Sequence, residues 1–224
     1  MDRKQASFIV DFEQMKKKKQ TIYEQALMDV YGLLFSYVEK HANLREKVRA
    51  KHLFTHKAGL SNTQLDKTYQ LHFEHWFVFD YVTVIGSRVF DMFVRESKND
   101  LTKPMLDLCG HLMLMTLEPV KVNKVSGESI TVERLITGVE QEVQCFLISP
   151  NVTEGDYGFM RLAPVGFSTK IIGPGFSIDQ REVNRVEKQV NDAIDSHPQD
   201  VENVKVKRFL KEYGIDFIRY ASRI

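Results

Sequence analysis

Two pairs of histidines are the residues best suited to chemistry in this sequence: His52 with His56, and His72 with His75. The four-residue spacing of His52 and His56 places their imidazoles on one face of a helix, and the second pair, three residues apart, would complete a set of four ligands for a zinc ion. The pattern lacks the glutamate that zinc proteases carry directly after the first histidine, because Leu53 stands there. A metal-dependent hydrolase built on these four histidines is therefore an alternative interpretation, and we predict no metal and no other cofactor.

Nucleophilic catalysis has less support. Cys109 and Cys145 are the two cysteines of the chain, and each lies in an apolar run, which predicts buried, reduced thiols. Cys109 and His111 are two residues apart, so on a helix they face different directions and cannot act as nucleophile and base. The sequence contains no glycine-rich phosphate loop and no serine elbow motif. We therefore predict no catalytic residues.

Positive charge is concentrated at the start of the chain. Residues 1–60 hold 12 Lys and Arg against 7 Asp and Glu, whereas residues 101–180 hold 6 against 9. A cationic segment of this kind can bind phosphate, and aromatic side chains beside an arginine can stack on bases. The candidate binding residues are Lys16, Lys17, Lys18, Lys19, Tyr157 and Arg161.

The segment HFEHWFVFDY, residues 72–81, could be a core helix, a binding platform or the edge of a metal site. The apolar stripe that begins at Leu65 continues into it at helical spacing, which favours a core helix. We expect this helix to begin near Thr63, after a Gly59–Thr63 loop, and to end near Asp80. Trp76 is the expected anchor of its core.

Other helices are predicted on both sides of this one. A three-to-four spacing of apolar residues over 20–52 indicates one amphipathic helix, with the lysines at its start. Residues 87–95 and 101–119 are also helical in pattern, the second with Pro104 in its first turn. Helices are predicted again over 177–197 and near 205–213.

Beyond Pro119 the apolar residues alternate with polar ones, and turn-forming residues separate the runs. This pattern predicts five consecutive strands, and a sheet so short gains from closing into a small SH3-like or OB-like barrel. The expected fold is α+β: a helical domain over 1–117, a barrel over 118–178 and a helical segment over 179–224. The predicted strands cover 119–125, 129–136, 141–149, 157–164 and 168–173.

Three segments also carry a family resemblance: FEHWFVFDY (73–81), LEPVKV (117–122) and GFMRLAPVG (158–166). Their order resembles a group of uncharacterised bacterial proteins, common in Firmicutes, that often end in a SEC-C-type zinc-binding tail. This chain ends without the cysteine and histidine ligands of such a tail, so zinc binding is not carried over. In the W-x-x-F-D-Y pattern, the resemblance marks Trp76 as a helix anchor and Asp80 as a junction cap.

The sequence favours a non-catalytic adaptor or regulatory protein that binds a macromolecule. A protein partner is preferred, because the formal net charge is only +1 and the barrel region is acidic. Binding of RNA or DNA through the basic N-terminal helices is the first alternative, and the metal-dependent hydrolase is the second. The start of the chain lacks the apolar centre of a signal peptide, so we expect a cytoplasmic protein without membrane contact. The oligomeric state stays open.

Overall fold

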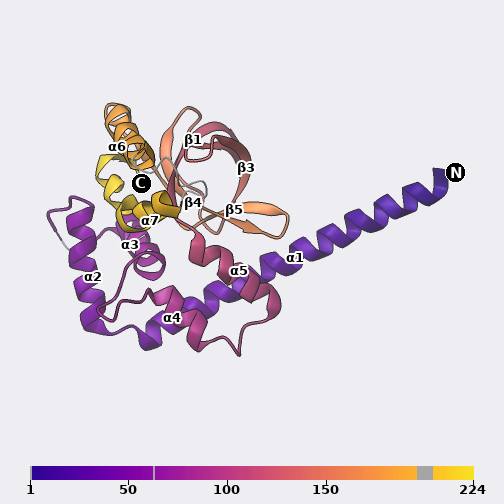
Figure 1. Cartoon of the computed structure of the whole chain (residues 1–224), viewed down its shortest axis with the longest axis horizontal. Coiled ribbons are helices and arrows are strands. Elements are labelled where there is room, and N and C mark those ends of the chain that lie inside the picture. The colour runs from indigo at the N-terminus through magenta and orange to yellow at the C-terminus, as the bar shows by residue number, and fades with distance from the viewer. Residues whose placement is uncertain (1, 63, 196–203) are drawn as a thin grey trace.

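A computed structural model describes residues 2–62, 64–195 and 204–224 of the chain. N-terminal helices are followed by a β-barrel and then by C-terminal helices, so the fold is α+β, as predicted (Figure 1). The helices are α1 (Asp2–His41), α2 (Leu44–Lys57), α3 (Lys67–Phe79), α4 (Val89–Glu96), α5 (Lys103–Leu114), α6 (Val183–Asp195), α7 (Val204–Tyr213) and the 3-10 helix η1 (Gly214–Tyr220). The strands are β1 (Leu117–Ser126), β2 (Ser129–Arg134), β3 (Val139–Phe146), β4 (Tyr157–Val165), β5 (Ser168–Ile172), β6 (Phe176–Ile178) and β7 (Ala221–Arg223).

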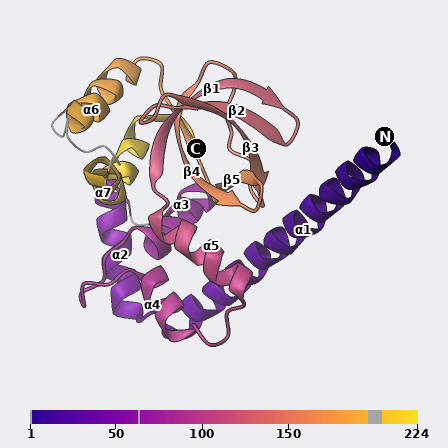
Figure 2. The ribbon, with the colours of Figure 1, turned by 45° about the vertical axis from the view of Figure 1, so that its right-hand side comes forward.

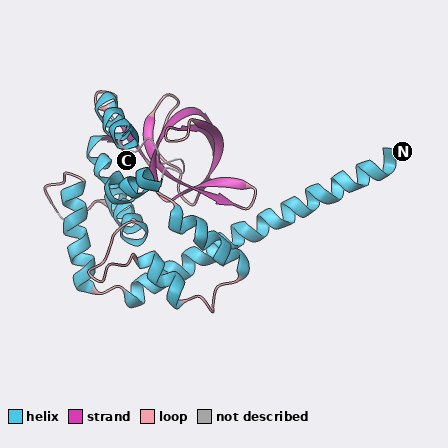
Figure 3. Cartoon of the chain, viewed as in Figure 1, coloured by secondary structure: helices cyan, strands magenta, loops and turns pink. Residues whose placement is uncertain are grey.

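In the described part of the chain, five strands close a barrel in the order β1-β2-β3-β5-β4, and β1 also pairs with β4 (Figure 3). β3 and β5 run parallel, whereas the other neighbouring strands of the barrel run antiparallel. Alternate side chains fill the interior, because successive residues of a strand point to opposite faces. The interior residues are Val120, Val122, Ile130, Val132, Val143, Val152, Met160, Leu162 and Ile171.

The outer face of the barrel is not all exposed to solvent. Phe159 and Ala163 of β4 lie on that face and belong to one apolar core with α1 to α5, α6 and α7. Two strands that the sequence did not predict extend the sheet here: β6 pairs with β4, and β7 pairs with β6. Helices and barrel therefore share one core across the outer face of β4.

Several helix boundaries differ from the predicted ones. The single helix predicted over 20–52 is two helices, because the chain turns at Asn43, whose side chain accepts a hydrogen bond from the Arg45 N–H and caps α2. α3 begins at Lys67 and is capped by Asp66. The predicted start at Thr63 lies outside the described residues, as do residues 196–203 between α6 and α7.

Helix α1 begins at Asp2, so the lysines lie within a long helix and not at its start. Its 40 residues would measure roughly 60 Å at 1.5 Å per residue. Within residues 11–41, whose side chains the structure describes, the buried positions begin at Ala26, and Leu27, Val30 and Leu34 are fully buried. Figure 2 shows the N-terminal half leading away from the barrel and from the other helices.

Candidate functional site

A buried ion pair joins the helical region to the barrel. Arg161 of β4 donates a hydrogen bond to the Asp80 carboxylate, and the two side chains are 0% and 2% exposed. Lys211 of α7 approaches the same carboxylate, with Nζ 3.5 Å from Oδ1, and it donates to the Phe79 carbonyl oxygen at 2.9 Å. Desolvation lowers the pKa of Lys211, while the charge of Asp80 acts in the opposite direction.

Strand geometry explains how an arginine comes to lie inside the protein. Met160 points into the barrel, so its neighbours Phe159 and Arg161 point outward, toward the helices. Asp80 is the residue at which α3 ends, and its N–H donates to the Trp76 carbonyl oxygen at 2.9 Å. A charge this deep requires a partner of opposite sign, and the end of α3 supplies one.

This placement bears on two of the predicted binding residues. Tyr157 is 5% exposed and Arg161 is fully buried. Stacking on a base requires an exposed ring or guanidinium face, which neither side chain has. The expectation that this pair contacts bases therefore fails on geometry, and Arg161 is placed to hold the barrel against α3.

His72 and His75 of α3 lie beside the ion pair. They are 0% and 3% exposed, and His75 Nδ1 lies 2.9 Å from the Leu71 carbonyl oxygen. Burial and the nearby Arg161 guanidinium, of which burial has the larger effect, lower the pKa of His72 to about 3 and that of His75 to about 4. Both rings are therefore neutral near pH 7, and His75 carries its proton on Nδ1, which donates to Leu71.

Gly173 closes this region from the barrel side. Its φ is +75°, a left-handed conformation that favours glycine, and a Cβ atom there would lie 2.2 Å from His75 Cδ2. The turn between β5 and β6 therefore packs directly on the imidazole.

Acid should destabilise the protein through these two histidines. In the unfolded chain their pKa is 6.5, so between pH 6.5 and 4 the unfolded state binds more protons than the folded state. Their contribution to stability is complete above pH 6.5 and is lost as the pH falls toward the folded values. We expect the free energy of unfolding, measured with urea, to drop by roughly 2–5 kcal/mol between about pH 7.5 and about pH 4.5.

Two variants test that assignment. His72→Phe removes one titrating ring and should reduce the drop by about half. Tyr31→Phe removes a buried hydroxyl from the same region, which does not titrate in this range, and should leave the drop unchanged. An equal pH dependence in the parent and in His72→Phe would show that other groups control acid stability.

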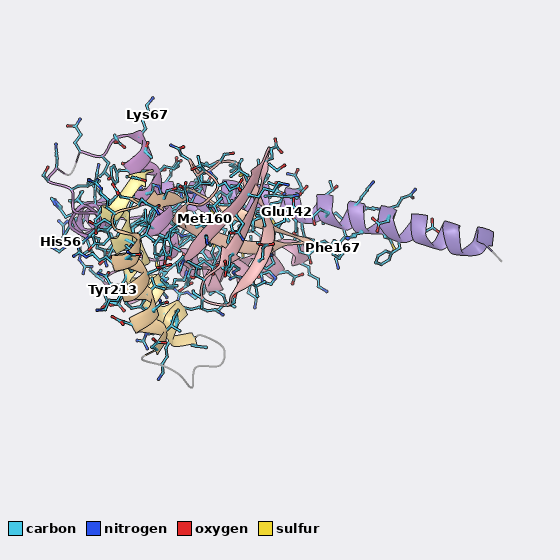
Figure 4. The ribbon with its side chains drawn as sticks, turned by 90° about the horizontal axis from the view of Figure 1, so that it is seen from above. His56, Lys67, Glu142, Met160, Phe167 and Tyr213 are labelled. Atoms are coloured by element: carbon cyan, nitrogen blue, oxygen red, sulfur yellow. The ribbon has the colours of Figure 1, made fainter. Side chains whose placement is uncertain are left out.

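The two histidine pairs do not share one environment. His52 and His56 lie exposed on α2, whereas His72 and His75 are buried on α3 (Figure 4 labels His56 at the surface). Within residues 2–62, 64–195 and 204–224, no three His, Cys, Asp or Glu side chains gather in a group that could hold a metal ion. The geometry therefore gives no support to a hydrolase built on the four histidines.

The lysines of α1 lie next to an exposed aromatic ring. Phe167, at the tip of the β4–β5 hairpin, is 53% exposed, and the Nζ atoms of Lys16 and Lys19 lie 5.7 and 5.5 Å from its ring centroid. Gln20 fixes the hairpin to α1, because its Oε1 accepts from the Phe167 N–H at 2.7 Å and its Nε2 donates to Ser168 at 2.9 Å. Figure 4 shows Phe167 near the place where α1 leaves the body.

A second feature of α1 was not recognised from the sequence. Phe12, Met15 and Ile22 are 52%, 66% and 46% exposed. At about 100° per residue these positions share one side of the helix, and that side continues into the buried Ala26 and Val30. Over residues 11–22, the projecting half of α1 therefore extends the apolar face by which the same helix packs on the body, and no other part of the chain that the structure describes buries it.

The barrel surface has the opposite charge. Glu133 of β2 pairs in register with Glu140 of β3, and Glu142 follows two residues later, exposed on the outside of the barrel (Figure 4). In OB-type barrels the corresponding strands often carry the face that binds oligonucleotides. Here like charges would repel a phosphate backbone, so the barrel face is unsuited to nucleic acid.

Neither protein-family models, nor curated proteins, nor solved structures match this chain. No helix in the described part of the chain has both the length and the hydrophobicity needed to span a bilayer.

Proposed function

We propose that this protein is a non-catalytic, cytosolic adaptor or regulatory protein, and that the projecting half of α1 binds a protein partner. The observation that carries the proposal is the uncovered stripe of Phe12, Met15 and Ile22. Large apolar side chains that follow one another along one helix face are typical of helices that pack against a partner. The buried Arg161–Asp80 pair would then serve to hold the body of the protein together, because it has no access to a substrate.

The chemistry of the stripe indicates the kind of partner. Helix faces with apolar residues three and four apart pack best against another helix, whose side chains fill the spaces between them. Lys16 and Lys18 lie on either side of the stripe, so acidic residues on the partner would pair with them. We therefore propose a helical partner with an apolar face and acidic flanks.

A pull-down from bacterial lysate with the tagged full chain tests whether the stripe binds the partner. Two variants are compared with the parent. Phe12→Ser with Met15→Ser should abolish capture of the partner, because it removes the apolar contacts. The control Glu13→Ser with Lys17→Ser changes the same helix away from the stripe and leaves the net charge unchanged, so it should capture as the parent does. Equal capture by the parent and the stripe variant would contradict the proposal.

One observation favours nucleic acid as a second candidate: Lys16 and Lys19 lie beside the exposed ring of Phe167, and cations next to an aromatic ring are typical of single-strand binding. The same experiment distinguishes the two candidates. If nuclease releases the captured material, and neutralising Lys16 to Lys19 both weakens binding and flattens its salt dependence, the nucleic-acid candidate is correct.

A further inference from the structure

We infer that the helix which covers the stripe is α1 of a second copy of this chain, packed antiparallel against the first. This inference rests on the proposed function, because it names the partner for the same surface. The proposed partner is a helix with an apolar face and an acidic flank, and residues 11–22 of α1 have the apolar face and, at its edge, Asp11.

The spacing of the stripe sets the register. Positions 12, 15, 19 and 22 alternate steps of three and four residues, which is the pattern of a helix pair that packs along one seam. In an antiparallel pair, Phe12 of each copy then faces Met15 of the other. Both side chains are more than half exposed in the single chain, at 52% and 66%. The antiparallel pair contains this Phe12–Met15 contact twice, so it would bury all four side chains.

Charge favours the antiparallel direction. Asp11 and Lys18 are exposed and lie along the same edge of the stripe, one before its centre and one after it. Reversing the second helix places Asp11 of each copy near Lys18 of the other, which makes two ion pairs related by symmetry. In a parallel pair, Lys19 would meet Lys19 in the seam, and like charges there oppose pairing.

The shape of the molecule permits this arrangement. The N-terminal half of α1 leads away from the body, so in an antiparallel pair the two bodies lie at opposite ends (Figure 2). The β4–β5 hairpin contacts α1 through Lys16 and Gln20, on the opposite edge of the stripe from Asp11 and Lys18, and through Lys19, which lies within the stripe between Met15 and Ile22. The hairpin therefore leaves the part of the stripe around Phe12 and Met15 open to the second helix.

Sedimentation velocity of the full chain over a concentration series tests the inference. The parent should shift from a mass of 26.0 kDa toward twice that value as its concentration rises. Asp11→Lys or Lys18→Asp should each weaken the dimer by about tenfold, because two attractions become repulsions, and the double variant should restore it. Glu13→Lys makes the same charge change as Asp11→Lys but lies away from the stripe, so it should not weaken the dimer.

Disulfide trapping tests the direction. In a Cys145→Ser background, equal amounts of Asp11→Cys and Lys18→Cys should cross-link mainly to each other under mild oxidation. Cross-links mainly between identical variants would indicate a parallel pair and overturn the inference. A parent that stays monomeric at every concentration, or a double variant that stays as weak as the single ones, would overturn it too.

These outcomes separate the inference from the function on which it depends. A monomeric parent that still captures a lysate protein through Phe12 and Met15 would exclude the second copy and keep the proposed function. If the variant with Phe12→Ser and Met15→Ser still captured the lysate protein and still formed the dimer, both the proposed function and the inference of a second copy would be wrong. The substituted positions are exposed, so α1 should stay helical in each variant, and circular dichroism checks this.

Discussion

Replacing Asp80 by alanine is expected to destabilise the protein by about 3–5 kcal/mol, because it leaves the Arg161 guanidinium buried without a counter-charge. Lys211, whose side chain is 10% exposed, would lose the same counter-charge and remain as a second buried cation. Urea unfolding at neutral pH measures the effect. Changing both partners, with Asp80→Leu and Arg161→Met, should cost less than Asp80→Ala alone, because no unpaired charge then remains.

The pair formed by Lys170 and Glu24 is the matched control for this prediction. Its nitrogen–oxygen distance is 2.9 Å, but the Glu24 side chain is 44% exposed. Glu24→Ala should therefore change the free energy of unfolding by at most about 1 kcal/mol. Similar costs for Asp80→Ala and Glu24→Ala would mean that the Arg161–Asp80 pair does not hold the helices to the barrel.

Trp76→Ala is expected to cost about 3–5 kcal/mol, because the side chain is 2% exposed and its removal leaves a cavity. The indole packs on Phe54 and Tyr81, with ring centroids 5.7 and 5.2 Å away. Phe12→Ala removes an aromatic ring that is half exposed and should change stability by no more than about 0.5 kcal/mol. Near-parent stability of Trp76→Ala would place this residue outside the core.

The barrel was predictable because β1 and β2 obey one simple rule. Val120 and Val122 alternate with polar neighbours, as do Ile130 and Val132, so twofold periodicity marks the strands that have one face inside the barrel. β6 has three residues, all of them buried, and such a run has no alternation to detect. Its pairing with β4 depends on a long-range contact that local pattern does not encode.

The buried junction was only half visible in the sequence. The β4 segment YGFMRLAPV is nearly continuous in apolar residues, which is the pattern of a strand covered on both faces. An arginine within such a strand needs a buried acid, and Asp80, at the end of an aromatic run, was one candidate beside Glu118, which also stands in an apolar segment. That signal could have placed Arg161 inside the protein, but it could not have chosen α3 over another helix as the cover.

Helix α1 extends further toward the N-terminus than predicted, for a different reason. Packing periodicity defines a helix only where it meets a core, and residues 11–22 meet none among the residues that the structure describes. The stripe of Phe12, Met15 and Ile22 shares its side with Lys19, which interrupts the apolar pattern in the sequence. The stripe could be recognised as an exposed apolar surface only from the structure, which places these residues beyond the body.

The most direct test of the account is to find what touches the stripe in the cell. A photoreactive amino acid at position 15 of the full chain, expressed in bacterial cells, should cross-link to protein on illumination. The same group at position 142, on the acidic face of the barrel, and at position 17, on the opposite side of α1, should give little product. No protein adduct at position 15, or adducts of equal yield at all three positions, would contradict the claim that α1 carries the binding surface.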